Sequence, residues 1–142
     1  MDVQTAQMTG FIDPIAIDRS VITRNIGFVL LPQFSMIAFS SAIEALRHAN
    51  YVSDRAIYEY ETFSADGEPV VASNGMALQV RRAMRDVDKL DIIFVCSGLD
   101  VQKNSDQEVI KHLRRLATHG SHVGAVCTGS FILAQAGLLD GF

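Results

Sequence analysis

Three stretches of the chain are almost continuously apolar over the length of a β-strand, at residues 25–31, 91–96 and 122–126. Runs of this kind are typical of parallel strands buried on both faces. Each is followed by a segment whose apolar residues have helical spacing. The alternation predicts an α/β fold with a mainly parallel sheet covered by helices on both sides.

The helix after the first run is predicted to begin at Met36, beyond a loop at 32–35. Its apolar positions have the spacing of one buried face: Met36, Phe39, Ile43 and Leu46. Arg47 and His48 are expected near its end, where positive charge suits the negative pole of the helix dipole. Glu44 reads as a solvated or ion-paired carboxylate rather than a site residue.

The helix after the second run is predicted to open with a capping box, Ser105 followed by Glu108. Its apolar stripe is Val109, Ile110, Leu113, Leu116 and Ala117. Gly120 is expected to end it. The helix after the third run should extend to about residue 136.

The middle of the chain has weaker patterns. Residues 58–63 alternate and predict a strand, and turn signals at 65–68 and 73–75 separate two short strand-like pieces, 69–72 and 76–80. These pieces are expected to flank the main sheet, with Met76, Leu78 and Val80 on one face. Residues 81–88 suggest a short helix or turn, and their three arginines a solvated face: Arg81, Arg82 and Arg85.

Cys127 lies where the third apolar run meets its helix, the construction of a nucleophile elbow. The helix N-terminus would favour negative charge there, and the free N–H groups of Thr128 and Gly129 could face an anion or an oxyanion. Ala125 departs from the glycine that the hydrolase form of the motif has before its nucleophile. A buried, inert cysteine is an equal alternative on spacing alone.

Ligands of open α/β sheets bind beyond the carboxyl ends of the strands. Three loops are expected at that edge, at 32–35, 97–100 and 127–129. Their convergence would place Cys127 opposite the N–H group of Gly98.

Composition narrows the function classes. The 142 residues suit one domain, with 49% hydrophobic and 20% charged residues. A net charge of −4 argues against nucleic-acid binding by this segment. No apolar run is long enough to span a bilayer, and no signal peptide is evident. The two cysteines, Cys96 and Cys127, have no metal-type spacing and fit a reduced, cytoplasmic protein.

Three segments together resemble the ThiJ/PfpI (class I glutamine amidotransferase-like) superfamily. They are residues 26–50 (IGFVLLPQFSMIAFSSAIEALRHAN), 62–80 (TFSADGEPVVASNGMALQV) and 124–141 (GAVCTGSFILAQAGLLDG). More closely, the chain is similar to the N-terminal domain of AraC-type transcriptional regulators of the GlxA kind.

The resemblance implies a flavodoxin-like three-layer sandwich at residues 25–142, after an N-terminal leader at 1–24 that could hold a short turn at Asp13–Pro14. Such domains are usually homodimeric and sense a small metabolite, such as an amino acid or a quaternary amine like betaine or carnitine. In the full-length regulators a C-terminal pair of helix-turn-helix motifs binds DNA. The elbow cysteine corresponds to Cys127, and its oxyanion-type donors to the N–H groups of Gly98 and Thr128.

This sequence departs from the reactive members of the superfamily in three ways. Those members often carry a glutamate after the first strand, but residues 34–38 here contain no carboxylate. Hydrolytic relatives place a histidine beyond the elbow helix, and none of the four histidines matches it: His48, His112, His119 and His122. The DNA-binding half does not occur before Phe142. We therefore expect an incomplete domain that self-associates or is poorly stable when isolated.

The resulting hypothesis is a sensing domain without catalysis, cofactor or metal, whose effector binds near the elbow. The expected ligand-binding residues are Cys127, Thr128, Gly98, Ser97, Phe34, Ser35 and Met36. One alternative is a cysteine enzyme, either a hydrolase (amidase or peptidase) or a glyoxalase. A third hypothesis is redox sensing through Cys127, for which Cys96 offers no evident resolving partner.

Overall fold

The computed structural model describes residues 22–142. In chain order the elements are β1 (Arg24–Leu30), α1 (Met36–Ser53), β2 (Tyr58–Ser64), β3 (Val70–Val71), β4 (Ala77–Leu78), β5 (Arg82–Ala83), the short 3-10 helix η1 (Met84–Asp86), β6 (Ile92–Cys96), α2 (Gln107–Thr118), β7 (His122–Val126) and α3 (Gly129–Gln135). The expected leader at 1–24 lies almost wholly outside the described residues, as does its turn at Asp13–Pro14, and Arg24 already belongs to β1.

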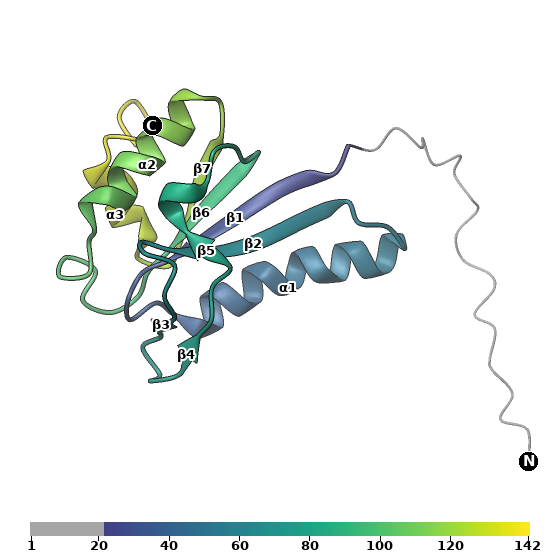
Figure 1. The fold of residues 1–142 in the computed structure, drawn as a ribbon, viewed down its shortest axis with the longest axis horizontal. Helices are drawn as coiled ribbons and strands as arrows, with labels where there is room; N and C mark the ends of the chain where they lie inside the picture. Colours follow the sequence, from purple (N-terminus) through teal and green to yellow (C-terminus); the bar gives the residue numbers. More distant parts are fainter. Residues whose placement is uncertain (1–21) are drawn as a thin grey trace, which may run out of the picture.

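Five strands form one parallel sheet in the order β5-β2-β1-β6-β7. Helix α1 covers one face, and α2 and α3 cover the other (Figure 1). The predicted α/β class, a flavodoxin-like three-layer sandwich with a mainly parallel sheet, is thereby confirmed. Strand order reverses between β1 and β6, so the carboxyl ends of these strands border the crevice in which such folds bind ligands.

The central strand β1 contributes side chains to both hydrophobic cores, one on each face of the sheet. Ile26, Phe28 and Leu30 point to the α1 side, whereas Val29 and Leu31 point to the side of α2 and α3. Because successive side chains of a strand alternate, a continuous apolar run fills both layers. Each fully buried aliphatic or aromatic side chain contributes about 1.5–3 kcal/mol to folding.

Helix α1 begins after Ser35, whose side chain accepts a hydrogen bond from the N–H group of Ala38. The helix continues to Ser53 and has no basic residue in its last turn, so Arg47 and His48 lie inside it and the predicted end-of-helix role is wrong. Arg47 instead pairs with Glu44 at 2.6 Å, which confirms the prediction of an ion-paired carboxylate.

Helix α2 begins differently from the prediction. Asp106, not Ser105, is the N-cap, and its carboxylate accepts hydrogen bonds from the N–H groups of Glu108 and Val109. Ser105 instead donates to the side chain of Gln135 at 2.6 Å. A carboxylate one residue later competes better for the orphan N–H groups of the first turn. The apolar stripe is buried as expected, and the chain turns away at Gly120 with a φ of 93°.

Two predictions for the middle of the chain need correction. Strands β3 and β4 form an antiparallel sheet of their own rather than flanking the main one. Strand β4 contains only Ala77 and Leu78, so Met76 and Val80 lie outside it and the predicted strand at 76–80 is too long; Met76 is exposed and Val80 is buried. Residues 81–88 include the strand β5, which pairs with the end of β2 and precedes η1.

Candidate functional site

Strand β7 and helix α3 meet in a sharp turn at Cys127. Its φ of 56° is in the left-handed region, which non-glycine residues seldom adopt, and its side chain is exposed. Strained residues of this kind gather at functional sites. The predicted strand–turn–helix arrangement is therefore present, and the alternative of a cysteine buried at this turn is wrong.

Two glycines let the loops around the elbow approach one another. A Cβ atom on Gly129 would lie 2.1 Å from the carbonyl oxygen of Val95 in β6. A Cβ atom on Gly98 would lie 2.2 Å from the carbonyl oxygen of Gln33. In both cases the obstacle is rigid backbone, so only glycine fits without displacing a neighbouring segment.

The three loops predicted to converge at the carboxyl edge are joined by hydrogen bonds. Phe34 and Gly98 form an isolated antiparallel bridge. The N–H group of Ser35 donates to the oxygen of Ser97 at 3.2 Å, and the hydroxyl of Thr128 donates to the oxygen of Gly98 at 2.7 Å. The β1–α1 loop, the β6 loop and the elbow thus form one hydrogen-bonded unit.

Backbone donors remain available in this unit. Within residues 22–142, the N–H groups of Gly98 and Thr128 donate to no acceptor. Thr128 lies directly before α3, where helix geometry leaves N–H groups without intrahelical partners. Such donors can hold a carboxylate or an oxyanion.

The other expected site residues contribute less surface. The side chains of Phe34 and Ser97 are 0% and 1% exposed, so a ligand at this edge could meet them only through their backbone. Ser35 uses its hydroxyl to cap α1, and Met36 is half-buried against the core on the α1 side. Among the expected site residues, Cys127 is exposed, and Thr128, like Ser35 and Met36, is half-buried.

The Cys127 thiol makes no hydrogen bond to an imidazole or carboxylate of residues 22–142. His112 and His119 bond to carbonyl oxygens of α2, at 2.7 and 2.6 Å. His122 is exposed at the start of β7, the opposite end of that strand from the elbow. Burial raises the pKa of the second thiol, Cys96, to about 12, so it stays protonated at neutral pH.

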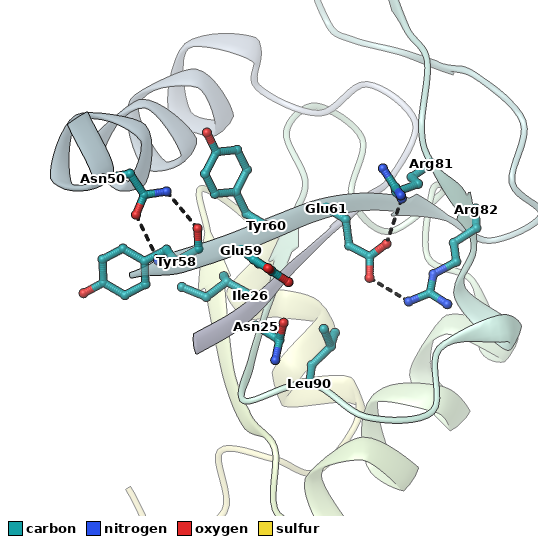
Figure 2. A pocket seen from close by; sticks show the side chains of 10 residues that line it. All are labelled: Asn25, Ile26, Asn50, Tyr58, Glu59, Tyr60, Glu61, Arg81, Arg82 and Leu90. Carbon is teal, nitrogen blue, oxygen red and sulfur yellow. Dashed lines mark hydrogen bonds and ion pairs between the residues drawn. The ribbon is translucent and has the colours of Figure 1, made fainter. Parts of the chain in front are cut away.

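Two cavities that the sequence did not indicate lie away from the elbow. One, of about 460 Å³, adjoins the carboxyl ends of β1 and β2 and the loop before α2, with Pro32, Asp66 and Lys103 among its lining. The other, of about 730 Å³, lies near the amino ends of the same strands (Figure 2). Cys127 and Thr128 line neither. The turn at 65–68, at the carboxyl end of a predicted strand, was the available signal for the smaller cavity.

Residues 22–142 were also searched for membrane-spanning helices and for metal sites. No helix there is long and apolar enough to cross a membrane. No group of three or more histidine, cysteine, aspartate or glutamate side chains there is arranged to hold a metal ion.

The structure is a parallel α/β sandwich with a cysteine elbow at the carboxyl edge of its sheet, and the same class of domain is found by comparing the sequence with known protein families. The model of the DJ-1/PfpI family matches residues 24–142, and the chain belongs to that family. This confirms the expected superfamily.

Several similar proteins are transcriptional regulators. The HTH-type transcriptional regulator GbdR of Pseudomonas aeruginosa is 41% identical over 119 residues, which cover 84% of this chain and 32% of the regulator. The HTH-type transcriptional regulator GlxA of Rhizobium meliloti is 32% identical, with 82% of this chain and 36% of that protein covered. The similarity to these regulators supports the expected regulator class, and the chain spans about a third of their length.

A solved structure and an enzyme complete the comparison. The crystal structure of an AraC family transcriptional regulator from Pseudomonas putida superposes with a TM-score of 0.74 at 28% identity, covering 84% of this chain and 64% of that one. An isonitrile hydratase from Pseudomonas putida is 31% identical, over 82% of this chain and 49% of the enzyme. Similarity to this chain therefore extends to an enzyme as well as to regulators.

Proposed function

We propose that this chain is the effector-sensing domain of an AraC-type transcriptional regulator, which binds a small amino-acid-like or quaternary-amine molecule without transforming it. The similarity to HTH-type regulators over most of this chain supports the class. DNA would be contacted by a helix-turn-helix segment of a longer protein, since this chain has a net charge of −4. We further propose a cytoplasmic homodimer.

The observation that carries the proposal is the set of unused donors at the elbow. A carboxylate on the effector would accept hydrogen bonds from the N–H groups of Gly98 and Thr128, beside the Cys127 side chain. Phe34 and Ser35 of the β1–α1 loop, Met36 at the start of α1 and the buried Ser97 would form the supporting wall. Backbone donors held by packed loops are preorganised, which lowers the entropic cost of binding.

The surroundings of the thiol support binding without transformation. A cysteine nucleophile requires a base, and the base requires an orienting group. Cys127 has no such partner within residues 22–142, and the accessible histidines of α2 bond to their own helix. The elbow would therefore serve as a binding feature.

A thermal-shift screen with single amino acids, glycine betaine and carnitine tests the proposal. A ligand at a hundredfold excess over its Kd stabilises the folded state by about 2.7 kcal/mol. The Thr128→Val variant, which loses the hydrogen bond to Gly98, should lose most of this stabilisation. Thr118→Val removes a comparable hydroxyl contact on α2 and should keep it. Equal losses in both variants, or no stabilisation by any compound, would refute the proposal.

The second candidate is a cysteine enzyme, an amidase, peptidase or glyoxalase or, as one relative suggests, an isonitrile hydratase. The exposed, strained Cys127 favours it. Incubation with an isonitrile, simple amides, a peptide and methylglyoxal, with Cys127→Ala as the control, distinguishes the two. Turnover that disappears in the Cys127→Ala variant would favour the enzyme over the sensor.

A further inference from the structure

Along the outer edge of β2, the edge that faces away from β1, some backbone N–H and C=O groups have no hydrogen-bond partner within residues 22–142. In the parallel pairing of β1 with β2, the N–H group of Arg24 donates to the oxygen of Ile57, and Arg24 and Ile26 lie opposite Tyr58 and Tyr60. This register turns the N–H and C=O groups of every second β2 residue away from β1. Tyr58, Tyr60 and Thr62 therefore present their backbone groups to the outer edge.

Two of these three residues have partners. The side-chain amide of Asn50, at the end of α1, donates to the oxygen of Tyr58 at 2.8 Å and accepts from its N–H group at 2.9 Å. Further along, the N–H group of Arg81, beside β5, donates to the oxygen of Thr62 at 3.0 Å. Between them, the N–H and C=O groups of Tyr60 have no hydrogen-bond partner within residues 22–142.

Tyr60 is one of four consecutive β2 residues that line the cavity of about 730 Å³, so the cavity runs along this part of the strand. Figure 2 shows Asn50 bridging to Tyr58 at one end of this cavity, and Arg81 and Arg82 turned towards Glu61 at the other. Arg82 meets Glu61 at 2.6 Å and Arg81 at 3.6 Å. The surroundings are polar and charged, which suits a hydrophilic small molecule.

We propose that this cavity binds a small molecule bearing a primary carboxamide, which bridges the N–H and C=O groups of Tyr60. The protein itself shows this mode of contact: two residues earlier on the same edge, the side-chain carboxamide of Asn50 bonds to both the N–H and the C=O group of Tyr58 and serves as a template. A primary carboxamide offers both the acceptor and the donor that the pair requires.

The size of the gap selects a small ligand over a peptide strand. An added strand would need a row of free edge groups, but Asn50 occupies the position before Tyr60 and β5 the position after it. The free groups at this edge are the N–H and C=O of Tyr60 and the N–H of Thr62, which are too few for an added strand but enough for one amide group. This site lies at the amino ends of the strands, and the elbow lies at the carboxyl ends, so the inference stands independently of the proposed effector site.

Titration of the ¹⁵N-labelled chain with propionamide, followed by amide NMR, tests the proposal. The amide signal of Tyr60 should move in a saturable way, whereas that of Tyr58, already bonded to Asn50, should stay in place. N,N-dimethylpropionamide has the same carbonyl but no N–H donor, and should move the Tyr60 signal far less. A Tyr60 signal that stays in place, or that moves equally with both compounds, would overturn the proposal.

The Asn50→Ala variant offers a gain of response as a second test. Removing the carboxamide frees the Tyr58 groups, so propionamide should now move the Tyr58 signal as well as that of Tyr60. If Tyr58 is still unresponsive in the folded variant, the template argument fails. Where Asn50→Ala does not fold, Asn50→Asp removes the donor to the Tyr58 oxygen and keeps the acceptor. The Tyr60 result in the unmodified chain decides the proposal in either case.

Discussion

Replacing Gly129 by alanine should destabilise the fold through one identifiable contact. The added Cβ atom would lie 2.1 Å from the carbonyl oxygen of Val95 and 3.0 Å from its carbonyl carbon. An ordinary contact begins near 3.4 Å, so the start of α3 would have to move away from β6 by more than 1 Å. Both partners are backbone, and neither can turn aside as a flexible side chain could.

Overpacking of this kind costs about 3 kcal/mol where the surroundings cannot relax. For a domain of this size, such a loss lowers the Tm by about 10 °C. Differential scanning calorimetry or urea unfolding of the Gly129→Ala variant would measure it. Because the elbow moves with α3, the effector binding proposed at Cys127 should weaken as well.

Gly75→Ala is the matched control, because its added methyl group would meet nothing within 4 Å. Its φ of 85° makes alanine unfavourable there by about 1 kcal/mol, without any steric clash. Gly129→Ala should therefore lower the free energy of unfolding more than Gly75→Ala does, although the backbone of Gly129 is not in the left-handed region. If Gly129→Ala is no more destabilising than Gly75→Ala, the close packing of the elbow against β6 is refuted.

Three further results are expected. Asp106→Ala should lower the free energy of unfolding by about 1 kcal/mol through loss of the α2 cap, and Ser105→Ala by less, as urea midpoints would show; equal losses would contradict the assignment of the cap. A thiol reagent should label Cys127 in the native chain and Cys96 only after unfolding, as mass spectrometry would show; native labelling of Cys96 would contradict its burial. The backbone N–H group of Asn25, and then the charge of Arg24, lower the pKa of Asp91. The ionised carboxylate therefore stabilises the fold above about pH 4, and this contribution is lost as the pH falls through the lowered pKa. The difference in unfolding free energy between wild type and Asp91→Asn should shrink over that range, and a constant difference would contradict the assignment.

Much of the fold could be predicted because its signals are local. The apolar run from Ile26 to Leu31 fills two cores at once, and its short length with Pro32 at its end favours a strand over a buried helix. The elbow at Cys127 was equally readable, since it lies where strand periodicity changes to helical periodicity. The convergence of its loop with that of Gly98 followed from the rule that parallel strands end at one edge.

The failures depend on contacts that sequence spacing does not contain. Strand β5 has only two residues, Arg82 and Ala83, and it forms because they pair with the end of β2. The sequence offers Ser105 and Asp106 as rival caps, and spacing does not reveal that the Ser105 hydroxyl donates to Gln135, thirty residues away, while Asp106 caps the helix. The burial of Phe34 and Ser97 depends on how the loops close over them, and their part in ligand binding stays a prediction.

The central claim is that the elbow binds a small effector and leaves it unchanged. The most direct test records amide NMR spectra of the ¹⁵N-labelled chain with each amino acid and quaternary amine, and assays the compound in the same tube afterwards. The account predicts that at least one compound moves the Gly98 and Thr128 signals and is recovered intact. A compound consumed through Cys127, or a panel that leaves both signals in place, would contradict it.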